Sequence, residues 1–146
     1  MIKNKRLLII LTTLLLAAIA CSGGTGGSVS GTQQSCNSSG GSGTCDARIN
    51  KLSGTFTHKV DTGFYNQGDP VFMEVDVTVQ TGQMKMTIES PDGFVTSIEV
   101  NPGTTNKLTG ISTVDYSMDE KFIPLTLEAL DGDVEGIEFT IAFSQP

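Results

Sequence analysis

Histidine is almost missing from this chain of 146 residues, which has only His58. A Ser–His–Asp catalytic system requires an imidazole, and no nucleophile elbow accompanies this one. We therefore expect His58 to pack or to form a hydrogen bond. Helical patterning is also missing, since no segment keeps a 3.6-residue apolar period over three turns. Beyond residue 20 no apolar run is long enough to span a bilayer, so we expect no second membrane segment.

Basic residues are scarce after the N-terminal segment. Three of the nine lie within residues 1–6, so six remain against all sixteen acidic residues, a net charge of −10. Such a surface repels nucleic acid and anionic lipid headgroups. We expect no nucleic-acid partner, and we interpret the charge as a means of keeping the domain soluble.

The first 20 residues predict a secretory signal. Residues 1–6 are basic, and Leu7–Ala20 follow as fourteen apolar or small residues without a charge. This order is typical of the n-region and h-region of a signal peptide. The run is too short to span a bilayer comfortably as a transmembrane helix.

The residues that end this segment resemble the lipobox of bacterial lipoproteins. Its four places are filled by Ala18, Ile19, Ala20 and Cys21, with Ala18 where Leu is usual. The resemblance implies cleavage after Ala20, a diacylglycerol on the Cys21 thiol, and an acyl chain such as palmitate on the new amino group. Two or three chains give stable anchoring. The expected location is the cell envelope, held by lipid. Because Ser22 rather than Asp follows the cysteine, an outer membrane, at its periplasmic or surface face, is expected in a Gram-negative organism.

The composition of residues 21–45 predicts a flexible tether. Gly, Ser and Thr dominate Ser22–Thr44, and such a coil spans roughly 25 Å. Within it, Cys36 and Cys45 are expected to form a disulfide, because export exposes them to an oxidising compartment and lipidation of Cys21 leaves an even number. A redox or metal pair is disfavoured, since the spacing is not C-x-x-C and no histidine is near.

Residues 46–146 alternate apolar and polar positions, as half-buried strands do. Five stripes are evident: Leu52, Gly54, Phe56, His58 and Val60; Val71, Met73, Val75, Val77 and Val79; Met84, Met86 and Ile88; Ile123, Leu125, Leu127 and Ala129; Ile137, Phe139, Ile141 and Phe143. Turn sequences separate them. The pattern predicts an all-β domain, an antiparallel β-sandwich of seven or eight strands. Pro124 interrupts one run, so that strand is expected at an edge or with a bulge.

The stretch from Val71 to Ile88 and the turn Ser90-Pro91-Asp92-Gly93 after it are similar to those of bacterial jelly-roll accessory domains, including pre-peptidase C-terminal domains. The resemblance implies a jelly-roll-like sandwich and an extracellular binding or spacer module. It transfers no functional residue.

Two groups of residues are candidate sites. Asp131, Asp133 and Glu135 in a hairpin turn offer hard oxygens for calcium, which a second acidic group (Asp115, Asp119 and Glu120) would join in space. The EF-hand pattern is incomplete, and solvated turn carboxylates are the alternative. Phe64, Tyr65 and Tyr116 lie in loops, where exposed aromatic rings stack on sugars; the alternative is that they cap the ends of the sandwich.

The chain is therefore expected to be a membrane-anchored lipoprotein with a non-enzymatic binding or structural domain. Its expected partners are the membrane, through the lipid, and a glycan or an envelope protein. No cofactor is expected unless calcium binds. Two alternatives stay open: a calcium-dependent carbohydrate- or peptide-binding domain, and a minor hydrolase with paired carboxylates.

Overall fold

A computed structural model describes residues 26–63, 65–117 and 120–146. These residues form eleven strands and no helix. In chain order the strands are β1 (Ser28–Ser30), β2 (Gln33–Ser39), β3 (Ser42–Ser53), β4 (Thr55–Asp61), β5 (Pro70–Thr78), β6 (Met84–Glu89), β7 (Val95–Val100), β8 (Asn106–Thr113), β9 (Asp115–Ser117), β10 (Glu120–Ala129) and β11 (Val134–Ser144). The predicted signal peptide, the lipobox with Cys21, Phe64 and Asp119 lie outside the described residues.

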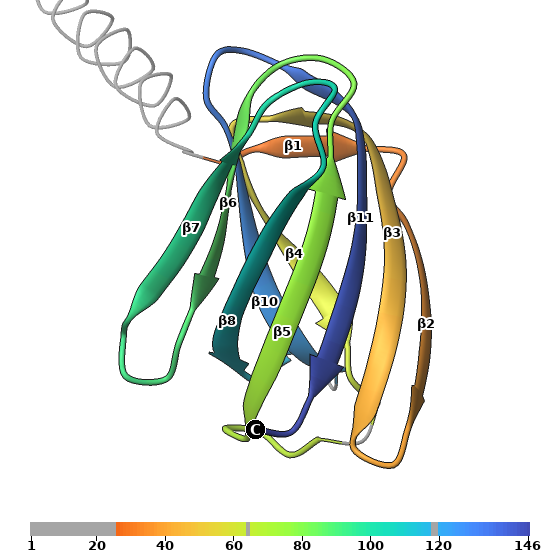
Figure 1. Cartoon of the computed structure of the whole chain (residues 1–146), viewed down its shortest axis with the longest axis vertical. Helices are drawn as coiled ribbons and strands as arrows, with labels where there is room; N and C mark the ends of the chain where they lie inside the picture. Colours follow the sequence, from red (N-terminus) through yellow and green to blue (C-terminus); the bar gives the residue numbers. More distant parts are fainter. Residues whose placement is uncertain (1–25, 64, 118–119) are drawn as a thin grey trace, which may run out of the picture.

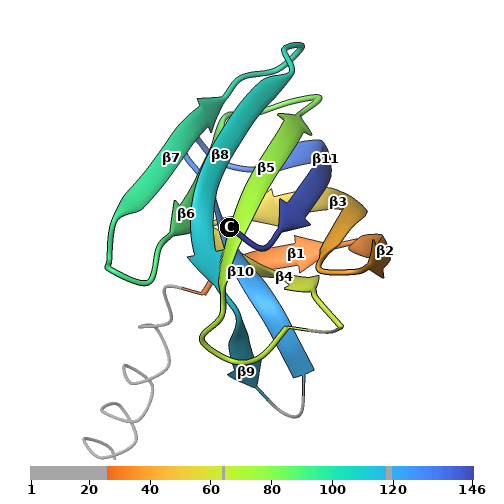
Figure 2. The ribbon, with the colours of Figure 1, turned by 60° about the horizontal axis from the view of Figure 1, so that its bottom comes forward.

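Two antiparallel sheets form the predicted β-sandwich (Figures 1 and 2). One sheet runs β1-β3-β11-β5-β8, with β2 also paired to β3, and the other runs β4-β10-β6-β7, with β9 paired to β10. Chain neighbours β3 and β4, β5 and β6, β7 and β8, and β10 and β11 lie in opposite sheets. This is the eight-strand arrangement of a jelly roll. The predicted strand count matches these eight, and β1, β2 and β9 are additional.

The core lies between the two sheets and uses the predicted stripes. Val71, Met73, Val75 and Val77 of β5 are fully buried, as are Met84 and Met86 of β6. The same holds for Ile123, Leu125 and Leu127 of β10 and for Ile137 and Ile141 of β11. Burial of each such side chain contributes about 1.5–3 kcal/mol. Within the described residues there is no helix of the length and apolarity needed to cross a bilayer.

Gly54 divides what the sequence presents as one stripe. Leu52 belongs to β3 in the six-stranded sheet, whereas His58 and Val60 belong to β4 in the other. Gly54 has a φ of 69°, a conformation that glycine adopts without strain. Its carbonyl accepts a hydrogen bond of 2.8 Å from the backbone N–H of Ala129. The chain therefore crosses between sheets at this glycine, and the single-strand interpretation is wrong.

The expectation for Pro124 also needs correction, because β10 is an inner strand. On one side β10 pairs with β4, where Pro124 stands opposite Lys59. On the other side, β9 pairs as far as Phe122 and β6 pairs from Thr126 onward. Pro124 occupies the interval between these two partners. In that interval no backbone hydrogen bond of the sheet requires an N–H group from residue 124, so a proline is tolerated.

The prediction of a flexible tether is wrong for residues 26–45. The Gly/Ser-rich stretch forms β1, β2 and the start of β3, with β2 and β3 joined by a tight hairpin at residues 39–42. Cys36 stands opposite Cys45 in this hairpin, and the predicted disulfide between them is confirmed. The segment is ordered because β3, twelve residues long, provides a backbone ladder on which a weak strand forms. Composition alone does not reveal such a partner.

Candidate functional site

The outward face of the six-stranded sheet is a regular array of polar side chains. The alternation that buries Val71 and Met73 turns Glu74 and Asp76 outward. Strand register aligns these positions in rows that cross the sheet. One row is Ser35, Asp46, Thr140, Asp76 and Lys107, the next is Asn37, Thr44, Ala142, Glu74 and Thr109, and the third is Ser39, Ser42, Ser144, Phe72 and Ile111.

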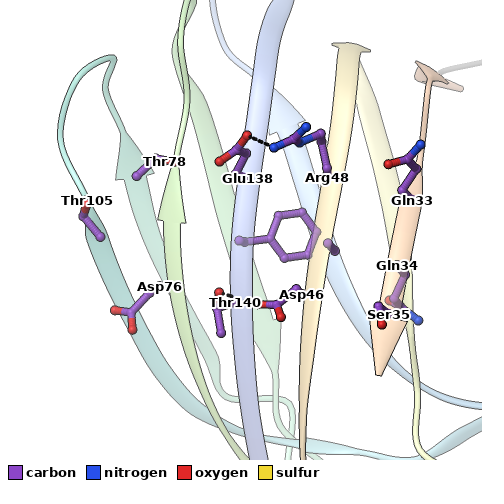
Figure 3. A pocket seen from close by; sticks show the side chains of 12 residues that line it. Gln33, Gln34, Ser35, Asp46, Arg48, Asp76, Thr78, Thr105, Glu138 and Thr140 are labelled. Atoms are coloured by element: carbon purple, nitrogen blue, oxygen red, sulfur yellow. Dashed lines mark hydrogen bonds and ion pairs between the residues drawn. The ribbon is translucent and has the colours of Figure 1, made fainter. Parts of the chain in front are cut away.

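Two adjoining hollows lie on this face. The first, of about 570 Å³, is lined by residues of β2, β3, β5 and β11 and by Thr105 (Figure 3). The second, of about 480 Å³, begins one row further along the strands and includes Phe72, Glu74 and Ala142. We call the two hollows together the trough. It extends from the row of Gln33 and Glu138 to the row of Ser39 and Ser144, three row spacings or roughly 20 Å.

Two polar contacts hold charged side chains in the first hollow, one of them an ion pair. Arg48 Nη2 lies 2.5 Å from Glu138 Oε1, and the Thr140 hydroxyl donates a hydrogen bond of 2.8 Å to Asp46 Oδ1 (Figure 3). Both partners of the Arg48–Glu138 pair are about half exposed, so the pair adds little stability. With Asp76, this hollow carries one positive and three negative groups, a net charge of −2.

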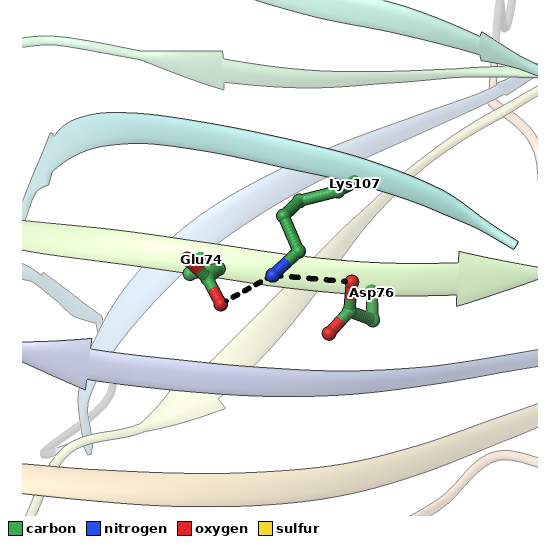
Figure 4. Close-up of polar contacts among 3 residues, drawn as sticks. All are labelled: Glu74, Asp76 and Lys107. Carbon is green, nitrogen blue, oxygen red and sulfur yellow. Dashed lines mark hydrogen bonds and ion pairs between the residues drawn. The ribbon is translucent and has the colours of Figure 1, made fainter.

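Lys107 closes the trough on the β8 side. Its Nζ lies 2.6 Å from Glu74 Oε1 and 3.8 Å from Asp76 Oδ1 (Figure 4). The hydrogen bond with Glu74, followed by the charge of Asp76, raises the pKa of Lys107. The ammonium group therefore stays charged and holds two carboxylates along this wall.

His58 lies in the core beside this face rather than in the trough. It is 3% exposed, and its ring meets Phe139 edge-on with the ring centroids 4.9 Å apart. Nε2 is 2.6 Å from Gln34 Oε1, which fits an Nε2–H that donates to the amide oxygen. Burial lowers the pKa of His58 to about 4, so the ring is neutral at pH 7. The predicted packing and hydrogen-bonding role is confirmed.

Of the three aromatic residues predicted to form a ligand surface, Phe64 lies outside the described residues, and the structure contradicts the prediction only for Tyr65. Tyr65 is 1% exposed, its hydroxyl donates a hydrogen bond of 2.6 Å to the Gly41 carbonyl, and its ring packs against Phe143. Tyr65 therefore caps the sandwich end and fastens the β2–β3 hairpin, and the prediction that it contacts a ligand is wrong. Tyr116 is 44% exposed and lines a separate hollow with Lys59 and other residues of β4 and β10.

The acidic turn residues do not form the predicted calcium site. The carboxylate of Asp133 binds Lys51 at 2.6 Å and accepts a hydrogen bond from the Ser53 hydroxyl; these contacts, Lys51 first, lower the pKa of Asp133. Glu120 begins β10 and Asp131 follows its other end, so the two acidic groups are roughly 30 Å apart. Within residues 26–63, 65–117 and 120–146, no three His, Cys, Asp or Glu side chains are grouped to hold a metal.

No protein-family model matches the chain, and no curated protein matches it. Solved structures match the chain at low identity and with TM-scores below 0.5. The CBM22-1–GH10 part of xylanase 10B from Clostridium thermocellum, complexed with xylohexaose, is 14% identical with a TM-score of 0.42, and the match covers 84% of this chain and 26% of that one. A family 11 carbohydrate-binding module from the same organism, with a mixed-linked tetrasaccharide, is 11% identical (82% and 87% covered, TM-score 0.34).

Bacillus endospore appendages, described as disulfide-linked pili, are 11% identical, with 81% of this chain and 93% of that chain covered and a TM-score of 0.39. The structural neighbours thus include carbohydrate-binding modules with β-sandwich folds. Likeness at this level concerns the fold, and function has to be argued from the site.

The sequence interpretation missed the trough, although part of its signal was visible. Glu74, Asp76 and Thr78 alternate with the clearest apolar stripe, which by itself indicates only the outward side of a strand. Their importance depends on strand order, because β11 places Thr140 and Ala142 between them and β3.

Proposed function

We propose that this protein is a non-enzymatic binding module of a bacterial cell envelope, held by lipid on Cys21, and that it binds a glycan chain in the trough. The observation that carries the proposal is the pair of adjoining, mainly polar hollows across β2, β3, β11 and β5. A depression of roughly 20 Å along the strands suits an extended polymer better than a compact small molecule.

The floor of the trough supports close approach by such a chain. Along β11 the outward side chains become small, from Glu138 through Thr140 to Ala142 and Ser144. Donors and acceptors line both walls, with Asn37 and Thr44 on one side and Glu74 on the other. Hydroxyl-rich ligands form hydrogen bonds with groups of this kind, whereas the net charge of the first hollow opposes anionic polymers.

Binding without catalysis is supported by the state of the ionisable groups. Glu138 is about half exposed and ion-paired with Arg48, whereas the general acids of glycosidases lie in desolvated sites. The buried imidazole of His58 is occupied by Gln34.

Anchoring is supported by the lipobox-like residues that precede the domain. The described part begins at Gly26, five residues after Cys21. Five residues reach at most roughly 18 Å, so a lipid on Cys21 would hold the sandwich close to the membrane surface.

Blocking the floor of the trough tests the binding proposal. Ala142→Arg adds a long cation at an exposed position of β11, and Ser97→Arg on exposed β7 is the matched control. Binding to envelope glycans, measured by a glycan array and by titration calorimetry, should be lost in Ala142→Arg and kept in Ser97→Arg. Equal binding by both variants would contradict a ligand site in the trough.

Replacement of Cys21 tests the anchor. Cys21→Ser should abolish labelling by an alkyne fatty acid and leave the precursor uncut or release the protein, and Cys36→Ser should keep the label. Continued labelling of Cys21→Ser would refute lipid anchoring.

A further inference from the structure

An exposed apolar pair stands at one end of the trough. Phe72 of β5 lies directly opposite Ile111 of β8, and their side chains are 40% and 43% exposed. Phe72 also lines the second hollow with Glu74 and Ser144. The rest of this row consists of serines (Ser39, Ser42 and Ser144), so the aromatic ring ends an otherwise polar floor.

Packing in the core does not explain the aromatic side chain of Phe72. Its neighbours along β5, Val71 and Met73, already fill the inward positions and are fully buried. A single exposed apolar residue requires no explanation. Here, however, two exposed apolar side chains are paired across strands beside a hollow that hydrogen-bonding groups line.

Resting on the proposed function, we propose that Phe72, supported by Ile111, is a stacking subsite for one sugar ring of a neutral glycan lying along β11. A pyranose has an apolar C–H face and polar hydroxyls at its edge. The face fits against the Phe72 ring, and Glu74 and Ser144, which line the same hollow, offer hydrogen bonds to the hydroxyls. Aromatic side chains offer such a rigid apolar surface at low entropic cost.

The charge of the trough disfavours anionic sugars. The trough contains Asp46, Glu74, Asp76 and Glu138 against Arg48 and Lys107, a net charge of −2. Both cations are already engaged by carboxylates, Arg48 at 2.5 Å and Lys107 at 2.6 Å. A uronic acid or phosphorylated polymer would bring further negative charge without an available cation in the trough.

Titration calorimetry on the full chain in detergent tests this inference. The probes are hexasaccharides of glucose, xylose and N-acetylglucosamine, with hexagalacturonate as the anionic counterpart. Phe72→Ala should weaken binding of the preferred neutral probe about tenfold or more, because the exposed part of the ring no longer becomes buried. Phe72→Tyr should retain binding. Phe94→Ala is the matched control, since Phe94 is 68% exposed in the turn before β7.

The outcomes separate this inference from the broader function. If Ala142→Arg abolishes binding while Phe72→Ala binds as well as Phe94→Ala, glycan binding in the trough is supported and the stacking subsite is refuted. Equal or tighter binding of hexagalacturonate, or binding of peptides alone, would refute the neutral-glycan assignment. If none of the four oligosaccharides binds, both proposals fail. Unchanged thermal melting of each variant excludes unfolding as the cause.

Discussion

Acidification is expected to destabilise this domain through His58. The imidazole lies between the two sheets, in contact with Gln34 of β2, Phe139 of β11 and Phe56 on its own strand. These three neighbours are uncharged, so no carboxylate compensates a proton on the ring. Burial is the cause of its lowered pKa, and the folded state therefore resists protonation while the unfolded chain accepts it.

The size of the effect follows from the two pKa values. The pKa of His58 falls from 6.5 to about 4 on folding, a difference of 2.5 units, and one unit corresponds to about 1.4 kcal/mol, giving about 3 kcal/mol. Because the unfolded state binds the proton at higher pH, this stability is complete above pH 6.5. It is lost progressively as the pH falls to about 4, and below that value His58 causes no further loss.

Urea unfolding at a series of pH values measures this loss, with His58→Gln as the variant that cannot titrate. The free energy of unfolding of the natural chain should fall by about 3 kcal/mol more than that of the variant between pH 6.5 and 4. Asp92 and Asp133, whose pKa values are lowered below 3.8 by hydrogen bonds from Ser90 and Lys51 respectively, lose their contribution at lower pH and equally in both proteins. If the free energies of unfolding of the two proteins fell in parallel over this pH range, the loss could not be assigned to His58.

Two further predictions concern the disulfide and Gly54, where the chain passes from one sheet to the other. Joint replacement of Cys36 and Cys45 by Ser should lower the free energy of unfolding by about 3 kcal/mol, because the unfolded chain then gains the entropy of an open ten-residue loop. Urea titration of the natural chain and of the variant, with and without reductant, measures this difference. If reductant did not change the stability of the natural chain, the prediction would be contradicted. Gly54→Ala should cost about 1–2 kcal/mol, since a side chain is strained at a φ of 69°. Gly26→Ala, where an added Cβ meets nothing within 4 Å, should cost little, and equal melting of the two glycine variants would count against the strain.

The inward faces of most strands were predictable because alternation is a local property. Val71 to Val79 have the same period whatever strand lies beside them, and all five are buried as expected. The disulfide was predictable for a similar reason, since Cys36 and Cys45 are close in sequence and paired by one hairpin.

Features that depend on distant partners could not be predicted in the same way. Gly54 continues the period of its neighbours, and only the Ala129 hydrogen bond and the positive φ show that the chain changes sheets there. From the sequence, Tyr65 has the features of an exposed loop aromatic. Only the structure shows that its hydroxyl donates a hydrogen bond to the carbonyl of Gly41, 24 residues earlier. The trough similarly requires β11 to lie between β3 and β5.

The central position of β11 also determines when the domain can be completed. Asp46 of β3 and Thr140 of β11 are 94 residues apart and hydrogen-bonded, and β11 joins β3 to β5. A ribosome must therefore synthesise nearly the whole domain before the six-stranded sheet can close. Non-local pairing of this kind makes folding slow, and the six-stranded sheet stays incomplete until β11 emerges. If the protein is exported as proposed, this delay keeps the chain unfolded for longer, and an unfolded chain is the form that a narrow translocation channel passes.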